Sequence, residues 1–387
     1  MKRESSTPRP NVEKHFDEIG FTYAHIDGVA YWDESARYVF TIREIEEDIE
    51  AAASEIDAMC LEIVSRIVAS EEMLDRLRVP QHGRNLIVES WKKRDPSLYG
   101  RFDFAYDGEG PAKLLEYNAD TPTSLYESAV VQWHWLEHQI ESGGLPHHAD
   151  QFNSLHDRLI ARFAEIAPES FVHFAAMSQS AEDFGTAAYL ADCAVQAKCA
   201  AAILDVNDIG LNGAQFCDRN GRNIETLFKL YPWEWMFADA FSHSPAMRVT
   251  RFLEPAWKAV LSNKGMLALL WEMAPGHPNL LECYFADDPR AASLGESYAK
   301  KPLYSREGAN VLLVKDGRAV ASAPGEYGVE GYVRQALHLL PRFDRRYPVL
   351  GAWIVGGVPA GLGIREDASP LTSNSSRFVP HCIVDQV

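Results

Sequence analysis

The sequence predicts a mixed fold, part α+β and part α/β, on three observations. A long amphipathic helix near the start of the chain is followed by two strand-like runs that carry charged residues on one face. Farther on, two short apolar runs flank a helical segment, which is the pattern of a parallel β-loop-α-β unit. Two more β-rich hairpins near the end of the chain add antiparallel strands.

The composition indicates a packed globular protein and excludes several kinds of partner. The chain has 387 residues, 47% hydrophobic and 24% charged, which is enough material for two or more lobes. A formal charge of −18 disfavours nucleic acid and anionic membrane surfaces. The sequence has no apolar run of membrane-spanning length and no signal-peptide pattern, and its six cysteines are scattered. We therefore expect a cytoplasmic protein with reduced, mostly buried cysteines.

The segment 41–68 is predicted to be a helix, because apolar residues recur in it every three or four positions. Thr41 and Glu44 have the spacing of a capping box at its start. The acidic run 46–48 follows in the first turns, where the helix dipole favours carboxylates. We interpret this run as a solvated helix face.

Residues 101–118, RFDFAYDGEGPAKLLEYN, are predicted to form a hairpin that turns within GEGP. With a four-residue loop, Asp103 faces Glu116 and Arg101 faces Asn118. Like charges directly opposite each other destabilise a strand pair, so the two carboxylates need a cation between them. Two carboxylates and an amide are oxygen ligands that suit Mg²⁺ or Mn²⁺. The alternative is an ordinary polar sheet face.

Local signals predict three further elements. The segment 121–140 reads as a helix with Thr121 as its N-cap and Pro122 at its first position. The pair 316–317, Asp-Gly, is typical of a tight hairpin turn, and the pair 356–357, Gly-Gly, indicates another.

The parallel unit lies in the region 165–255, and ligands of such units sit at the loop that leaves the first strand. Here that loop reads SQSAED, and it opens a helix with Glu182 and Asp183. The two carboxylates are either ordinary helix-start residues, which the dipole favours, or a site for a cationic amine.

Two lysines and a small-residue loop favour a phosphate site. Lys264 and Lys301 each interrupt apolar sequence, and two ammonium groups can neutralise the phosphates of a nucleotide. The loop 305–310, SREGAN, has residues small enough to approach a phosphate closely. Taken singly, each lysine is more simply a surface residue. The aromatic run YPWEWMF is interpreted as core rather than a stacking platform.

Several motifs in order resemble one family. RFDFAYD, GPAKLLEYNADTPTSLYE, SNKGMLALLWEMAPGHP, YAKKPLYSREGAN and SSRFVPH are similar to motifs of the glutathionylspermidine synthase family of ATP-grasp ligases. The resemblance covers nearly the whole chain and is strongest to the stand-alone bacterial acid–amine ligases of that family. It implies activation of a carboxylate by ATP as an acyl phosphate, followed by amide formation with an amine. The implied cofactors are ATP and Mg²⁺, with two ions.

The resemblance also implies roles for individual residues. Arg101 corresponds to the catalytic arginine beside the transferred phosphoryl group. Asp103, Glu116 and Asn118 correspond to the magnesium ligands, with Glu116 bridging two ions. The implied ATP contacts are Arg101, Phe102, Asp103, Lys264, Lys301, Gly308, Gln335 and Leu371. Thr121 and Ser124 correspond to the acid-substrate side, and Glu182, Asp183 and Thr186 to the peptide and amine side.

The implied organisation is one ligase domain over the whole chain, with an ATP-grasp fold in circularly permuted order, because the Glu-x-Asn motif comes early. Its expected regions are 1–164, with the magnesium hairpin; 165–255, a Rossmann-like pre-ATP-grasp substrate region; 256–345, the ATP-grasp lid; and 346–387, strands that close the nucleotide site.

The leading hypothesis is therefore an acid–amine ligase that acts on a small carboxylate and a small amine. An amidase domain, which precedes the synthetase in some members, is not found in the sequence, so we expect synthesis only. Ser124 stands where members specialised for glutathione carry a cysteine, so the resemblance does not identify the substrates. Two alternatives remain open, a magnesium-dependent phosphohydrolase or kinase and a catalytically silent binding protein.

Overall fold

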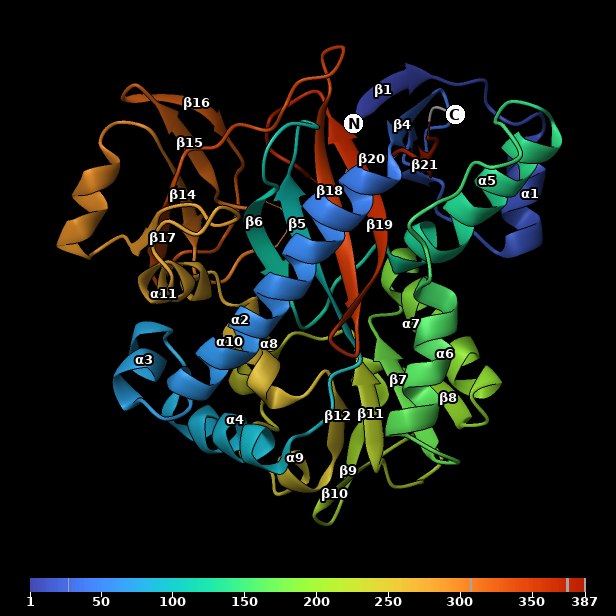
Figure 1. Ribbon diagram of the computed structural model, residues 1–387. Coiled ribbons are helices and arrows are strands. Elements are labelled where there is room, and N and C mark those ends of the chain that lie inside the picture. Colours follow the sequence, from blue (N-terminus) through green and yellow to red (C-terminus); the bar gives the residue numbers. More distant parts are fainter. Residues whose placement is uncertain (27, 307, 374–375, 386–387) are drawn as a thin grey trace.

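The computed structural model describes residues 1–26, 28–306, 308–373 and 376–385. In this part of the chain three large groups of strands stand side by side. Figure 1 shows an antiparallel sheet in the middle, a second antiparallel sheet on the left and a parallel sheet at the lower right. The predicted combination of antiparallel and parallel sheets is confirmed.

The central sheet joins the charged hairpin to the end of the chain. Its strands follow the order β20-β19-β18-β5-β6, and all its pairs are antiparallel. The strands are β5 (Tyr99–Ala105), β6 (Lys113–Asn118), β18 (Tyr347–Val355), β19 (Val358–Asp367) and β20 (Arg377–Phe378). Gly356 and Gly357 form the predicted turn between β18 and β19, with φ values of 59° and 83° that glycine tolerates best.

The hairpin has the predicted register at its charged residues, but its loop is longer than predicted. Asp103 pairs with Glu116 and Arg101 with Asn118. The strands end at Ala105 and resume at Lys113, so the predicted four-residue loop is too short. A bulge between Asp103 and Phe104 shifts the register by one residue and offsets the longer loop.

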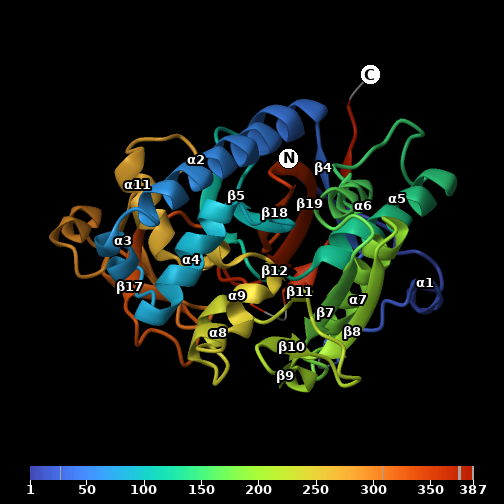
Figure 2. The same cartoon turned by 90° about the horizontal axis from the view of Figure 1, so that it is seen from below.

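The parallel sheet contains the predicted β-loop-α-β unit. Its order is β12-β11-β7-β8, with β7 (Phe171–Ala176), β8 (Ala200–Asp205), β11 (Thr226–Lys229) and β12 (Arg251–Leu253). Helix α7 (Ala181–Gln196) connects β7 to β8 and packs against both strands and against α6 (Leu155–Ile166). Figure 2 shows α6 and α7 beside β7 and β8 from below.

The second antiparallel sheet, which we call the lid sheet, follows the order β13-β17-β14-β15-β16. Its strands are β13 (Cys283–Phe285), β14 (Tyr298–Pro302), β15 (Leu312–Lys315), β16 (Arg318–Ser322) and β17 (Tyr332–Ala336). Asp316 and Gly317 form the predicted tight turn, with φ values of 49° and 73°. Helix α11 (Gly265–Met273) packs against β13 and β17.

The first predicted helix is present as a π-helical segment η1 (Glu44–Glu50) continued by α2 (Ala51–Ile67), which crosses in front of the central sheet in Figure 1. The capping box forms, because the Thr41 amide donates to Glu44 at 2.8 Å and the Glu44 amide donates to Thr41 Oγ1 at 3.3 Å. Glu46 and Glu47 are exposed, as expected for a solvated face.

The second predicted helix starts later than expected. The chain is helical from Leu125, through η2 (Glu127–Val131) and α5 (Gln132–Glu141), so Thr121 is no N-cap and Pro122 lies in a loop. Ser124 has a left-handed backbone with φ of 67°, which interrupts the helix before that point. The Thr121 hydroxyl instead accepts a hydrogen bond from Arg306 at 2.7 Å.

The two ends of the chain meet in a small sheet of β1 (Lys2–Ser5), β4 (Ala36–Phe40) and β21 (His381–Ile383), at the top of Figure 1. The remaining elements are α1 (Val12–Ile19), β2 (His25–Ile26), β3 (Val29–Ala30), α3 (Glu71–Arg76), α4 (Gln81–Lys93), η3 (Val206–Asp208), β9 (Gly210–Asn212), β10 (Gln215–Cys217), α8 (Trp233–Ala238), α9 (Ala246–Val249), η4 (Ala256–Lys258), α10 (Ala259–Ser262) and η5 (Pro289–Leu294). All six cysteines are free and five are buried, as predicted. No helix in the described ranges is long and apolar enough to cross a membrane.

Candidate functional site

Most of the predicted site residues line one cleft between the β5–β6 hairpin and the lid sheet. The cleft has a volume of about 170 Å³. The predicted residues among those that line it are Arg101, Asp103, Glu116, Asn118, Thr121, Lys264, Lys301, Gly308, Gln335 and Leu371. They come from segments far apart in the sequence, and the packing of the lid sheet against the hairpin brings them together.

The hairpin side of the cleft carries the three predicted metal ligands. Asn118 Nδ2 lies 3.3 Å from Asp103 Oδ2 and 3.4 Å from Glu116 Oε1, so the side chains of all three residues converge. No group of three or more His, Cys, Asp or Glu side chains that could hold a metal occurs in the described ranges. A metal here would therefore need the amide oxygen of Asn118 and oxygens from a ligand.

Basic side chains of the protein balance both carboxylates. Asp103 lies between two guanidinium groups, with Arg101 Nε at 2.7 Å from Oδ1 and Arg365 Nη2 at 2.9 Å from Oδ2. Glu116 Oε2 lies 3.1 Å from Lys264 Nζ. Burial alone would raise the pKa of Glu116, but Lys264 and Lys301 outweigh it and lower the pKa to about 2. The expected repulsion is thus already relieved by protein cations, and the strand pairing does not by itself require a metal ion.

The opposite wall of the cleft carries the two lysines. Lys301 Nζ donates to Gln335 Oε1 at 2.7 Å and to the Leu115 carbonyl at 2.8 Å. Burial lowers the pKa of Lys301 to about 8, although Glu116 opposes the shift. Lys264 Nζ donates to the Ser305 carbonyl at 2.9 Å. Both ammonium groups therefore lie at the cleft beside the carboxylates.

The predicted phosphate loop, 305–310, lies at the same cleft, with residue 307 outside the described residues. Gly308 has a φ of 73°, and a Cβ atom placed there would lie 2.6 Å from the Thr372 carbonyl oxygen. Only glycine fits this position without displacing the backbone. Arg306 reaches across the cleft to Thr121.

Phe102 and Ser124 lie outside the cleft. Phe102 points to the other face of the central sheet, is completely buried and stacks on Tyr117 with ring centroids 4.0 Å apart. Its side chain is thus not available to a ligand in the cleft. Ser124 is also buried, and its hydroxyl lies 3.2 Å from the Tyr31 hydroxyl.

The residues predicted for the amine side lie near the N-terminus of α7 and not among the lining of the cleft. Ser180 caps the helix, since its hydroxyl accepts from the Asp183 amide at 3.2 Å. Burial raises the pKa of Asp183, against an opposing effect of Arg306. Thr186 is completely buried one turn farther along. Glu182 and Asp183 are half-buried, so they are not simply a solvated helix start.

Four charged residues of the site were missed by the sequence reasoning. Arg365 contacts Asp103 of the hairpin and Arg306 contacts Thr121, both from positions far away in the chain. Arg306 lies in the predicted phosphate loop but was not singled out there, and no local pattern marks Arg365. Asp120 pairs with the buried Lys229, with its Oδ1 atom 2.6 Å from Nζ, and its other oxygen accepts from the Trp233 amide. The proximity of Asp120 to the Glu-x-Asn motif was the one available signal.

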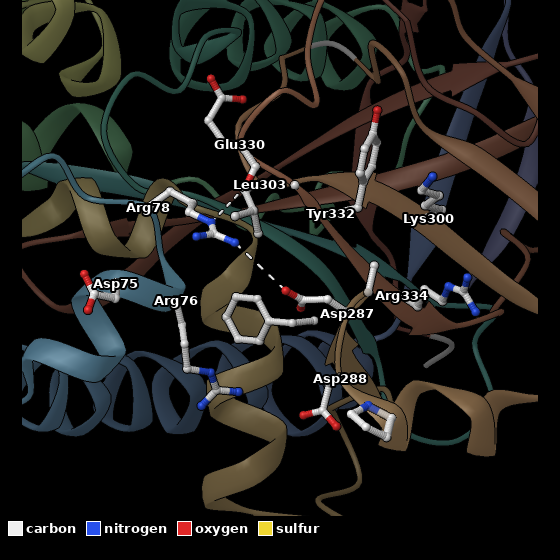
Figure 3. Close-up of a pocket in the computed structure, with 14 residues that line it drawn as sticks. Asp75, Arg76, Arg78, Asp287, Asp288, Lys300, Leu303, Glu330, Tyr332 and Arg334 are labelled. Carbon is white, nitrogen blue, oxygen red and sulfur yellow. Dashed lines mark hydrogen bonds and ion pairs between the residues drawn. The ribbon is translucent and has the colours of Figure 1, made fainter.

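A larger pocket lies on the outer face of the lid sheet, but it has no predicted site residue. Its volume is about 700 Å³. Figure 3 shows Arg78 between Asp287, 3.9 Å away, and the Glu330 carbonyl, 3.2 Å away. Neighbouring residues of a strand point to opposite faces, so Lys300 lines this pocket while Lys301 faces the cleft. The chemistry of the lining, and not the volume, selects the cleft as the candidate site.

Comparisons with known proteins identify the family of the chain. A family described as glutathionylspermidine synthase preATP-grasp matches residues 3–384. A Haemophilus influenzae protein that carries a provisional acid–amine ligase name is 43% identical over 402 residues, which span 99% of this chain and 100% of that protein. Trypanothione synthetase of Crithidia fasciculata is 27% identical over 82% of this chain and 52% of its own length.

Two further matches concern the larger enzymes and the fold. The bifunctional glutathionylspermidine synthetase/amidase of Escherichia coli is 24% identical over 95% of this chain and 62% of its own length. The chain thus spans 52% of the length of the Crithidia fasciculata trypanothione synthetase and 62% of the length of the Escherichia coli enzyme. The solved structure of a glutathione synthetase-like effector from Globodera pallida is similar in fold, with a TM-score of 0.54, 11% identity and 98% of each chain covered.

Proposed function

The chain belongs to the glutathionylspermidine synthase preATP-grasp family, and from this premise we propose that it is an ATP-dependent acid–amine ligase. The reaction joins a small carboxylate to a small amine through an acyl phosphate and releases ADP and phosphate. The observation that carries the proposal is the cleft, where two carboxylates and an amide face two lysines across a few ångströms. A cytoplasmic location and the exclusion of nucleic acid remain predictions from the sequence.

The residues of the hairpin fit a magnesium–nucleotide complex. Asp103, Glu116 and Asn118 supply three oxygen-bearing side chains that already converge. In this proposal Glu116 would be shared by two ions. Magnesium would supply positive charge to the phosphate oxygens. Lys264 and Lys301 would bind the phosphates, and Gln335 and Leu371 would lie toward the base. The protein cations that now hold the two carboxylates would be exchanged for the ion.

Binding of a nucleotide requires the lid sheet to move. A volume of about 170 Å³ is below the roughly 300–1,000 Å³ of pockets that bury small ligands. Side chains of the lid side contact the hairpin side of the cleft from Lys264 to Glu116, from Arg306 to Thr121, and from Lys301 and Gln335 to backbone carbonyls of β6. The first two join a cation to a group that the nucleotide and its metal would replace or displace.

Arg101 is the residue we assign to the phosphoryl-transfer step. Its side chain is buried at the wall of the cleft and is fixed by Asp103 and by the Thr123 carbonyl, to which Nη1 donates at 2.6 Å. A preorganised cation of this kind stabilises charge as it develops without the cost of reorganisation. The loop of Thr121 and Thr123 next to it would orient the carboxylate of the acid substrate. The lid sheet would exclude water, so that the amine and not water attacks the acyl phosphate.

We further propose the permuted ATP-grasp organisation. Regions 1–164 and 346–387 would together hold the nucleotide, with 256–345 as the lid and 165–255 as the Rossmann-like substrate region. Support comes from the central sheet, in which hairpin strand β5 lies beside β18, and from the parallel order of β7 and β8.

Stoichiometry tests the proposed reaction. The purified protein with MgATP is incubated with a panel of carboxylates and amines that includes glutathione and spermidine, and ADP release is measured. We expect release only when an acid and an amine are both present, with one amide formed per ADP. Release with a single substrate would indicate a kinase or phosphohydrolase, and no release with any pair would indicate a silent binding protein.

Gly308→Ala is expected to raise the KM for ATP at least tenfold with a smaller effect on the KM for the amine. A methyl group at this position meets the Thr372 carbonyl at 2.6 Å, and the φ of 73° disfavours any side chain. Gly276→Ala is the matched control, since Gly276 has a φ of 82° but no atom near its missing Cβ. Equal effects of the two variants would show that backbone strain, and not the approach to the nucleotide, is responsible.

A further inference from the structure

A buried cluster of polar side chains includes Ser124, and none of its residues lines the candidate cleft. Tyr31 donates a hydrogen bond to Glu127 Oε1 at 2.7 Å, and its hydroxyl also lies 3.2 Å from Ser124 Oγ. Tyr23 joins the cluster through its ring, whose centroid is 6.3 Å from that of Tyr31. None of Tyr23, Tyr31 and Glu127 was predicted as a site residue from the sequence.

Three oxygen atoms of this region have no hydrogen-bond partner. They are Glu127 Oε2, the Tyr23 hydroxyl and Thr186 Oγ1. The side chains are almost completely enclosed, with exposed fractions of 0%, 6% and 0%. Buried polar atoms nearly always have a partner, and three unsatisfied oxygens in one region are costly unless something else binds them.

Tyr23 and Glu127 lie beside α7, the helix that carries Thr186, at one junction of the fold. The ring of Tyr23 packs on α7 at Gly185, where a Cβ would lie 3.0 Å from Cε1 and 3.5 Å from the hydroxyl oxygen. Thr186 is the next residue of that helix. Glu127 begins η2, and its carboxylate is close enough to Tyr23 to raise the pKa of the Tyr23 hydroxyl. The junction therefore combines α7, η2 and the segment before β2.

The electrostatics of the junction favour a cation. Burial first, and then the charge of Glu182, raise the pKa of Glu127 to about 8, while Tyr31 and Arg101 oppose the shift. Tyr126 and Tyr23 also face this carboxylate, and their pKa values are raised in part by it. The free protein thus holds Glu127 as a neutral acid at pH 7, next to a second acidic group.

We propose, resting on the ligase function proposed above, that this junction binds a protonated primary amine of a substrate, with Glu127 as its ionised partner. An ammonium group has three donors and no acceptor, and Glu127 Oε2 and the Tyr23 hydroxyl are acceptor oxygens without partners at this junction, with Thr186 Oγ1 a further one on α7. Glu182 and Asp183 at the start of α7 stand at the half-buried side of the junction and extend its negative charge. The amine is either that of the amine substrate or the amino terminus of the acid substrate.

A sharp test is Tyr23→Phe, which deletes one oxygen atom that has no partner in the free protein. Binding of glutathione, spermidine and 1,3-diaminopropane at pH 8.5 is measured by calorimetry, with MgADP as a separate ligand. We expect at least tenfold weaker binding of one of the three probes, an unchanged or higher Tm and unchanged MgADP binding. Loss of glutathione binding alone would place the amino terminus of the acid at the junction, and loss of the amines alone would place the amine substrate there.

Glu127→Gln tests the charge. Because the ammonium needs the ionised carboxylate, binding of the probe should release a proton below pH 8, and its affinity should rise up to tenfold per pH unit from pH 6 to 8 and then level. In the Gln variant this pH dependence should disappear and the affinity at pH 8.5 should fall at least tenfold. Glu137→Gln on the exposed face of α5 is the matched control and should behave as the wild type.

The outcomes separate this inference from the ligase proposal. If MgADP binds but no probe binds the wild type up to 50 mM, or if both variants bind every probe as the wild type does, the junction is a structural cluster with a protonated Glu127 and the inference is overturned. If MgADP itself fails to bind, the proposed ligase function fails instead. Should Glu127→Gln not fold, Tyr23→Phe decides alone.

Discussion

Glu116→Gln is expected to abolish ATP turnover while the protein stays folded. The carboxylate lies at the centre of the cleft, 3.1 Å from Lys264 Nζ and 3.4 Å from Asn118 Nδ2, where a magnesium ion would bind. Its pKa of about 2 means that it is ionised at every working pH and available as a ligand. Loss of one charged ligand from such a site costs roughly 10²–10³-fold or more in kcat.

The fold should survive because the same residue is not needed for packing. Gln keeps the size of the side chain and can still accept a hydrogen bond from Lys264, and the strand pair loses one of two opposed carboxylates. Glu109→Gln, in the exposed turn of the same hairpin, is the matched control. The Tm in the absence of nucleotide and the rate of ADP release are measured together. A large fall in Tm with retained turnover would identify Glu116 as a structural residue.

The amino-acid sequence predicted this hairpin correctly because its signals are local. Alternation of charged and aromatic residues defines the two faces, and the glycines locate the turn. The register of Asp103 and Glu116 was correct even though the loop is longer, since a bulge offset the difference. A bulge has no distinct sequence signal here. The predicted pairing of Asp103 with Glu116 was therefore correct only because the bulge and the longer loop shift the register in opposite directions.

Contacts made across the fold could not be predicted in the same way. Arg365 bonds to Asp103 over 262 positions, and Tyr31 bonds to Glu127 over 96. Neither Arg365 nor Tyr31 belongs to a motif, and only the packing of sheets and helices brings each of them to its partner. The late start of the helix at Leu125 has a similar origin, because Thr121 bonds to Arg306 from the lid side instead of capping the helix.

The resemblance to a family located most of the cleft, whereas the physical argument explains what each residue can do there. Two neighbouring lysines illustrate the difference. Lys300 and Lys301 are both charged residues of β14, yet alternation turns Lys300 over the ring of Tyr332, 4.0 Å away, while Lys301 is buried at Gln335. Chemistry at the cleft can therefore be tested with a control one residue away.

Lys301→Gln is expected to raise the KM for ATP about 100-fold, which corresponds to the loss of a buried charge-assisted contact to phosphate. Lys300→Gln should change it less than twofold, because that ammonium lies on the opposite face of the lid sheet. Gln at position 301 can still bond to the Leu115 carbonyl, so the lid sheet should keep its geometry. Steady-state kinetics with ATP as the varied substrate measure the effect.

The pH dependence supplies a second readout for the same lysine. Burial lowers the pKa of Lys301 to about 8 from the usual 10.5, so the folded protein binds fewer protons than the unfolded chain between these values. The charged lysine therefore costs stability below pH 8, and this cost disappears as the pH rises from 8 toward 10.5. Lys301→Gln should consequently leave the Tm at pH 7 unchanged or raise it.

The affinity for ATP should depend on pH in the opposite direction. Phosphates bind the charged form of Lys301, so the affinity of the wild type for ATP should fall by up to tenfold per pH unit above pH 8, and that slope should be absent in the variant. A slope that persists in Lys301→Gln would assign the titration to another group and remove Lys301 from the nucleotide site.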